Sequence, residues 1–105
     1  MDWIAELAYF FAGVFGANGV PHFVNGISGR PFQSPFAQPP GVGESPPIVN
    51  VIWGTINFVI GYGLLRGVGA FSFSDTAAMA AVALGALLAA IGLAWHFGRV
   101  RAGKP

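Results

Sequence analysis

The sequence has no cysteine and few charged residues. Only 9% of its 105 residues are Asp, Glu, Lys or Arg, whereas about a quarter are charged in a typical soluble domain. The lack of cysteine excludes disulfides, thiolate nucleophiles, zinc fingers and iron–sulfur clusters. The formal net charge of +1 provides no basic surface of the kind that contacts nucleic-acid phosphates. We therefore expect no nucleic-acid partner.

Sequence motifs of the common enzyme classes are missing as well. The chain contains no Gly-x-Ser-x-Gly elbow, phosphate-binding loop, paired-carboxylate pattern or metalloprotease pattern. No repeat of solenoid length recurs, so residues 1–105 are expected to form one domain. The sequence predicts neither an enzyme nor a cofactor.

Hydrophobic residues, by contrast, make up 54% of the chain and gather in three long runs. The runs cover about residues 3–20, 47–66 and 75–98, and each is long enough as a helix to cross most or all of a ~30 Å hydrocarbon core. Asp2 and Glu6 stand where a secretory signal carries positive charge, so the first run is expected to be retained. These features predict an all-α integral membrane protein with three transmembrane helices, and the lipid bilayer as its solvent.

Seven of the eight prolines lie between Asn18 and Asn50. Because proline lacks an N–H group and fixes φ, Pro21 is expected to end or kink the first helix. Residues 21–46 should then form a long Pro/Gly-rich interfacial linker. Its two Pro-Phe pairs predict extended or polyproline-like turns on the membrane surface, with the rings of Phe32 and Phe36 in the interface.

Capping signals and charge set the remaining topology. Ser45 is the expected N-cap of the second helix, and Ser74 or Asp75 that of the third. With three spans, four of the five basic residues fall on the side of the C-terminus and only Arg66 on the other. The positive-inside rule then predicts an outside N-terminus and a cytoplasmic C-terminus.

Small residues form a stripe on each of two predicted helices. The third helix carries Ala81, Gly85, Ala89 and Gly92 on one face, and the second carries Gly54 and Gly61 in alternation with Asn50 and Asn57. In lipid, such stripes allow close backbone packing, which drives helix association. We expect these six residues to pack helices, either within the chain or between copies.

Most polar side chains are expected at one end of the bundle. The first and third spans run in the same direction, so His22 and His96 should lie at the same membrane face. The candidate polar cluster comprises Asn18, His22, Asn25, Arg30, Glu44, Asn50, Asn57 and His96. The histidines could donate to carbonyl groups, relay protons or, with a carboxylate, bind a metal. Arg30 could hold a lipid phosphate, and the asparagines could join helices or line a solute path.

The segment PHFVNGISGRPFQSPFA, followed by PPGVGESPPIVNVIWGTINFVIGYGLL, resembles a group of small bacterial membrane proteins of unknown activity. The likeness covers about half of the chain and implies a bacterial plasma-membrane protein. In size and in its first-span glutamate the chain is also similar to small multidrug resistance transporters. Those proteins have four spans and short loops, and this chain has neither.

Three functions remain open at this point. The first is association through the small-residue faces, as an accessory subunit of a membrane complex or as a homo-oligomer. The alternative is an oligomeric carrier or channel for a small solute, ion or lipid, with Asn18, Asn50 and Asn57 lining the path. A membrane enzyme acting on a lipid or quinone headgroup would depend on His22 and Arg30.

Overall fold

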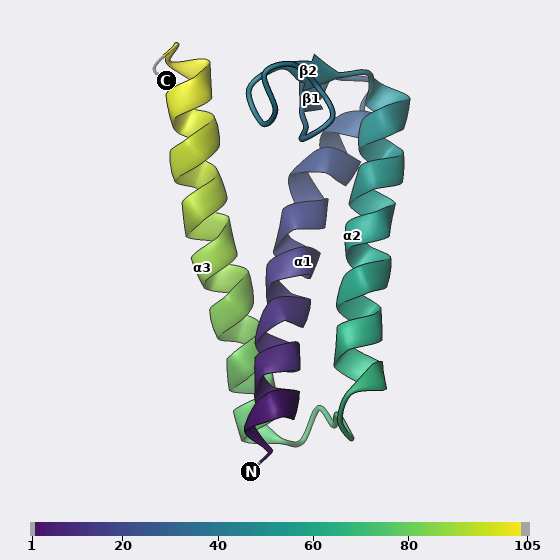
Figure 1. Ribbon diagram of the computed structural model, residues 1–105, viewed down its shortest axis with the longest axis vertical. Coiled ribbons are helices and arrows are strands. Elements are labelled where there is room, and N and C mark those ends of the chain that lie inside the picture. Colours follow the sequence, from purple (N-terminus) through teal and green to yellow (C-terminus); the bar gives the residue numbers. More distant parts are fainter. Residues whose placement is uncertain (1, 104–105) are drawn as a thin grey trace.

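The computed structural model describes residues 2–103 as a three-helix bundle covered at one end by a folded loop. The elements are α1 (Trp3–Ile27), β1 (Phe32–Gln33), β2 (Glu44–Ser45), α2 (Pro47–Gly67) and α3 (Thr76–Arg101). All three helices are long and apolar enough to cross a membrane. Figure 1 shows α1 beginning and α3 ending at opposite ends of the bundle. We call residues 28–46, which connect α1 to α2 over one end, the cap.

The first helix is longer than predicted. It passes through Pro21 and ends at Ile27, so the non-helical linker begins at residue 28 rather than 21. Pro21 removes only one N–H donor from the helix, and the next turn has its own support. The Asn25 amide donates to the Pro21 carbonyl at 2.7 Å, and Gly26 is buried against α2, where an added Cβ would lie 2.7 Å from the Pro47 carbonyl oxygen.

Two of the three helix starts have side-chain caps. The Asp2 carboxylate accepts from the N–H groups of Ile4 and Ala5, and the Asp75 carboxylate accepts from that of Ala78, as the sequence predicted for the third helix. The predicted N-cap at Ser45 is wrong, because Pro46 holds that position. Ser45 belongs to β2 instead, and its hydroxyl oxygen lies 2.6 Å from that of Ser34.

Helix α1 is central and packs against both α2 and α3 (Figure 1). At the α1–α2 contact, a Cβ on Gly54 would lie only 2.9 Å from the Gly19 carbonyl oxygen. At the α1–α3 contact, a Cβ on Gly85 would collide with the Phe10 carbonyl. These glycines therefore permit backbone contact between helices of the same chain.

The predicted stripes are used to different extents. On α2, Gly54 and Gly61 are buried together with Asn50 and Asn57. On α3, Gly85 is buried and Ala81 packs against the cluster around Tyr9. Ala89 is only half-buried, and Gly92 is exposed, with no described atom within 4 Å of a Cβ placed there. The stripe on α3 loses its partner because this helix diverges from α1 toward the cap (Figure 1).

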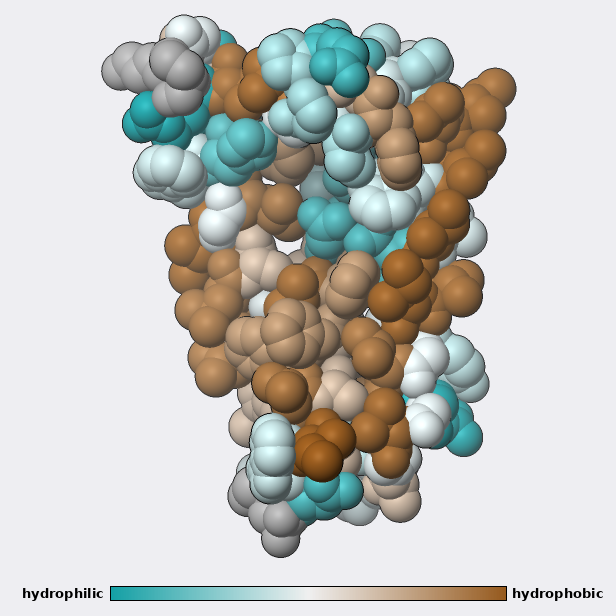
Figure 2. Space-filling model, in the orientation of Figure 1, coloured by the Kyte–Doolittle hydropathy of each residue, from teal (hydrophilic) through white to brown (hydrophobic). Residues whose placement is uncertain are grey.

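The cap is folded rather than laid out along a surface. Its two short strands pair antiparallel, with Phe32 opposite Ser45, a small β element that an all-α prediction does not include. The prediction that the Phe32 ring faces the interface is wrong, because that side chain is 3% exposed and its ring centroid lies 4.7 Å from that of Phe97. Phe36 is 61% exposed. Figure 2 shows hydrophobic residues along the helices and hydrophilic residues at both ends.

Candidate functional site beneath the cap

Asn50 connects the cap to two helices. It lies in the first turns of α2, is fully buried, and its Nδ2 donates to the carbonyls of Phe32 and Ser45 at 3.1 Å each. Its Oδ1 lies 2.8 Å from Nδ1 of His22 on α1. Because the amide nitrogen faces carbonyls, Oδ1 must be the acceptor, and Nδ1 of His22 therefore carries the hydrogen. In the neutral ring, Nε2 of His22 then presents a lone pair.

A second asparagine pair joins the same two helices deeper in the bundle. The Asn18 amide on α1 donates to Oδ1 of Asn57 at 2.8 Å, and Nδ2 of Asn57 donates to the Trp53 carbonyl at 2.8 Å. Asn57 is fully buried, so its amide finds the partner that burial in an apolar bundle requires. This is a hydrogen bond between helices, one of the two roles considered for Asn57 from sequence.

A cavity of about 230 Å³ lies between the cap and the three helices. Its volume equals that of about seven or eight water molecules at ~30 Å³ each. Every helix and the cap contribute to its walls, which include Asn18, His22, Gln33, Ser34, Trp53, His96 and Phe97. The two histidines, 74 positions apart in sequence (96 minus 22), thus line one cavity at one end of the bundle.

Gln33 is the polar residue that sequence reasoning missed. Its side chain is 5% exposed, it lines the cavity, and its Oε1 has no hydrogen-bond partner within residues 2–103. Buried polar atoms nearly always have a partner, and an unpaired one costs about 1–3 kcal/mol. The sequence holds no signal for this role, because glutamines in proline-rich loops are usually exposed, as Gln38 is here.

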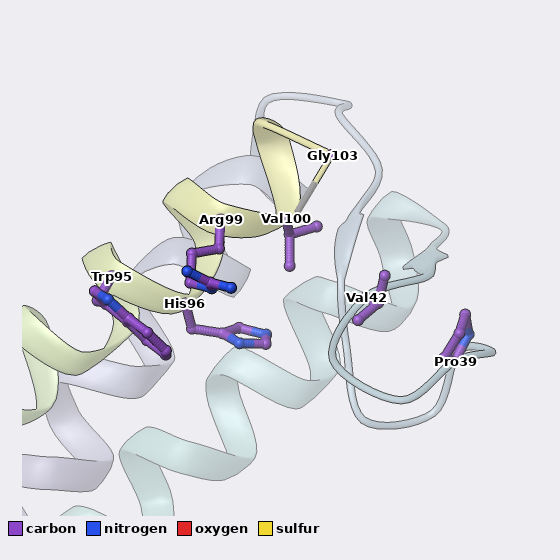
Figure 3. Close-up of a pocket in the computed structure, with 7 residues that line it drawn as sticks. All are labelled: Pro39, Val42, Trp95, His96, Arg99, Val100 and Gly103. Atoms are coloured by element: carbon purple, nitrogen blue, oxygen red, sulfur yellow. The ribbon is translucent and has the colours of Figure 1, made fainter. Parts of the chain in front are cut away.

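His96 fastens α3 to the cap. Its Nε2 lies 2.7 Å from the Gly41 carbonyl oxygen, so Nε2–H donates and the bond joins two segments distant in sequence. Figure 3 shows the ring pointing from α3 toward the cap loop. A second cavity, of about 500 Å³, lies on this side between the cap and the last turns of α3; it is lined by Pro39, Val42, Trp95, His96, Arg99, Val100 and Gly103 (Figure 3).

An apolar groove of about 370 Å³ runs between α1 and α3 next to the first cavity. Its lining is entirely apolar and consists of Ala17, Val20, Pro21, Ala90, Leu93, Ala94 and Phe97. Phe97 borders both the groove and the cavity. Figure 2 shows openings between α3 and the rest of the molecule below the cap. A cavity with several polar lining residues and an apolar groove thus adjoin at one end of the bundle.

The remaining members of the predicted polar cluster lie outside the cavity. Nε of Arg30 donates to Oδ1 of Asn25 at 3.1 Å, near the end of α1, and Glu44 is exposed on β2. Of the eight predicted residues, three therefore line the cavity (Asn18, His22 and His96), and Asn50 and Asn57 are fully buried. Asn25 is half-buried, and Arg30 and Glu44 are exposed. Within residues 2–103, no group of three or more His, Asp or Glu side chains could hold a metal ion.

Comparison with known proteins does not assign this chain to a family. No protein family, curated protein or solved structure matches the chain. The functional argument therefore rests on the cavity beneath the cap and on the residues that form it.

Proposed function

We propose that this is a multi-pass membrane protein that binds a small molecule in the cavity beneath the cap and does not transform it. The observation that carries the proposal is a cavity walled by all three helices and the cap, beside which the Gln33 amide is buried with its Oε1 lacking a hydrogen-bond partner among the described residues. A bound molecule in contact with this amide would supply a hydrogen bond that the described residues do not. The residue counts of the positive-inside rule favour a cytoplasmic cap in a bacterial plasma membrane.

The cavity is better suited to holding a molecule than to chemistry. Its lining, as far as the chain is described, includes no Asp or Glu. The Ser34 hydroxyl is occupied by Ser45 and by the Phe36 N–H group, and His22 is fixed in one tautomer by Asn50. A general base paired with a nucleophile, which covalent catalysis needs, is therefore missing from these lining residues.

Association with a membrane complex or a second copy is a second candidate. It is favoured by α3, of which only 11% of the most apolar window is buried inside the chain, and by the exposed Gly92. Gly54 and Gly85 argue less for it than the sequence suggested, because they already pack against α1. The carrier or channel alternative expects Asn18, Asn50 and Asn57 to line a solute path. Of these three, only Asn18 lines the cavity, because Asn50 and Asn57 are fully buried.

Mild extraction from the native membrane followed by intact-complex mass measurement tests both candidates. The ligand proposal predicts a mass above that of the chain by one retained small molecule. Association predicts a multiple of the chain mass or the added mass of a partner. A single bare chain, with no retained molecule across several mild detergents, would contradict both.

A pair of glutamine variants connects a retained mass to the cavity. Gln33→Leu removes the buried amide at nearly constant volume and should lose the retained molecule. Gln38→Leu changes an exposed glutamine of the same loop and should keep it. Equal retention by the two variants would place the bound molecule elsewhere.

A further inference from the structure

The hydrogen-bonding side chains that face a ligand in the cavity are those of Gln33 and His22. The Gln33 amide is buried with its Oε1 unpaired in the described chain, and the hydrogen on Nδ1 of His22 leaves Nε2 as an acceptor in the neutral ring. Nearby, Pro21 has no N–H to donate to the Ala17 carbonyl, and both residues line the adjoining groove. A hydroxyl group complements both side chains, because it can donate to Nε2 of His22 and either donate to or accept from the Gln33 amide.

The charges around these hollows favour a neutral ligand. Within residues 2–103, no Asp or Glu lines the cavity or the groove. Two arginines lie near these hollows but line neither of them: Arg99 lines the second cavity together with His96, and the Arg101 guanidinium lies 5.5 Å from the centroid of the Phe32 ring. A cation would meet these like charges without a compensating carboxylate, and an anion would face the lone pair on Nε2 of His22 with neither guanidinium in the lining, so either would be desolvated without a partner.

The groove offers a place for a hydrocarbon chain that continues from the cavity. It shares Phe97 with the cavity, and Val20, Ala90 and Ala94 are exposed along it. If α1 and α3 span a bilayer, the groove opens toward the acyl chains. A hydrocarbon chain gains little hydrophobic free energy on moving from lipid to such a groove. The role of the groove is therefore to hold the attached headgroup at the depth of the cavity.

We infer that the molecule held beneath the cap is a neutral amphiphile, with a hydroxyl-bearing headgroup in the cavity and a hydrocarbon chain in the groove between α1 and α3. This inference rests on the proposed function and names its ligand class. Monoacylglycerols and lipid hydroquinones share this chemistry. The headgroup donates to Nε2 of His22 and hydrogen-bonds the Gln33 amide, and the hydrocarbon chain passes Phe97.

Binding of defined probes to the purified full chain in lipid nanodiscs tests the inference by native mass spectrometry. The hydroxyl probes are 1-oleoylglycerol and a decyl-substituted hydroquinone, and the stronger of the two identifies the headgroup source. Methyl oleate has a chain without donors, and glycerol has donors without a chain. We expect at least one hydroxyl amphiphile to bind one per chain, about tenfold or more tightly than methyl oleate or glycerol, the difference that about 1.4 kcal/mol makes.

Two alanine positions on α3 provide a matched pair of variants that test the binding of the hydrocarbon chain in the groove. Ala90→Phe fills the groove and should weaken the preferred probe by about tenfold or more. Ala83→Phe places the same ring on an exposed position of α3 outside the groove and should change binding less than about twofold. If Ala90→Phe fails to fold, Ala94→Leu narrows the same groove with a smaller side chain.

The outcomes separate this inference from the proposal beneath it. Equal binding of methyl oleate and the hydroxyl probes would overturn the role of the headgroup, and equal binding of glycerol would overturn the role of the chain. Unchanged binding in Ala90→Phe would remove the groove from the site. A molecule retained from the native membrane, together with no binding of either hydroxyl probe, would refute the ligand class and leave the proposed function standing.

Discussion

Asn50 is predicted to be the residue that holds the cap on the bundle. In Asn50→Leu, two hydrogen bonds to the Phe32 and Ser45 carbonyls are lost, at about 1 kcal/mol each. The Nδ1–H group of His22, which now donates to Asn50, is left buried without an acceptor, at about 1–3 kcal/mol. The free energy of cap opening should therefore fall by about 3–5 kcal/mol.

Hydrogen exchange of the full chain in nanodiscs measures this change directly. The Gly41 N–H group donates to the Ser34 carbonyl at 2.8 Å, so its exchange reports cap opening. A loss of about 3 kcal/mol lowers its protection by about a hundredfold or more. Asn50→Asp has the same shape but directs an acceptor at two carbonyls, and it should open the cap as well.

The control for this experiment lies one to two turns further along α2. Thr55→Val removes an exposed hydroxyl that bonds only to the Val51 carbonyl of its own helix, and it should change the opening free energy by about 0.5 kcal/mol or less. Protection of Gly41 that is equal in Asn50→Leu and Thr55→Val would refute Asn50 as the anchor of the cap. The hydrogen bonds of Asn50 would then be a consequence of cap folding rather than its cause.

Two further predictions concern the helices. Gly85→Ala should destabilise the bundle by about 1–3 kcal/mol, because its methyl group meets the Phe10 carbonyl. Gly92→Ala should be neutral or stabilising by up to about 1 kcal/mol. Unfolding by SDS in mixed micelles compares the two variants, and an equal loss of stability in both would contradict the packing of Gly85 against α1. A double-mutant cycle of Asn18→Leu and Asn57→Leu should give a coupling of about 0.6–2 kcal/mol, and a coupling near zero would show that their hydrogen bond does not stabilise the bundle.

The helices and the polar end of the bundle were predictable because their signals are local or follow from topology. The predicted runs at about 47–66 and 75–98 match α2 and α3 closely, since long apolar runs have few other solutions in lipid. The meeting of His22 and His96 in one cavity follows from three antiparallel spans. Residue type narrowed the N-cap of the third helix to Ser74 or Asp75, and the structure uses Asp75.

The errors of prediction lie where distant segments outweigh local preference. Proline at position 21 favours a helix end, yet α1 continues because its next turn packs against α2. Ser45 is a good N-cap by type, but pairing with Phe32 places it in a strand. The burial of Phe32 and Gln33 depends on contacts with α1 and α3, and no pattern within the linker distinguishes these two residues from Phe36 and Gln38.

The hydrogen bonds that hold the cap come from side chains other than that of Gln33. Asn50 binds both strands, Ser34 lies within hydrogen-bond distance of Ser45, and His96 ties α3 to Gly41. An apolar residue of similar size at position 33 would satisfy the same fold and avoid the cost of about 1–3 kcal/mol for a buried unpaired carbonyl. Gln33→Leu should accordingly stabilise the unliganded protein while it weakens binding. A polar group that makes no hydrogen bond within the described chain, buried beside a cavity with two histidines, is what supports our proposal of a bound molecule.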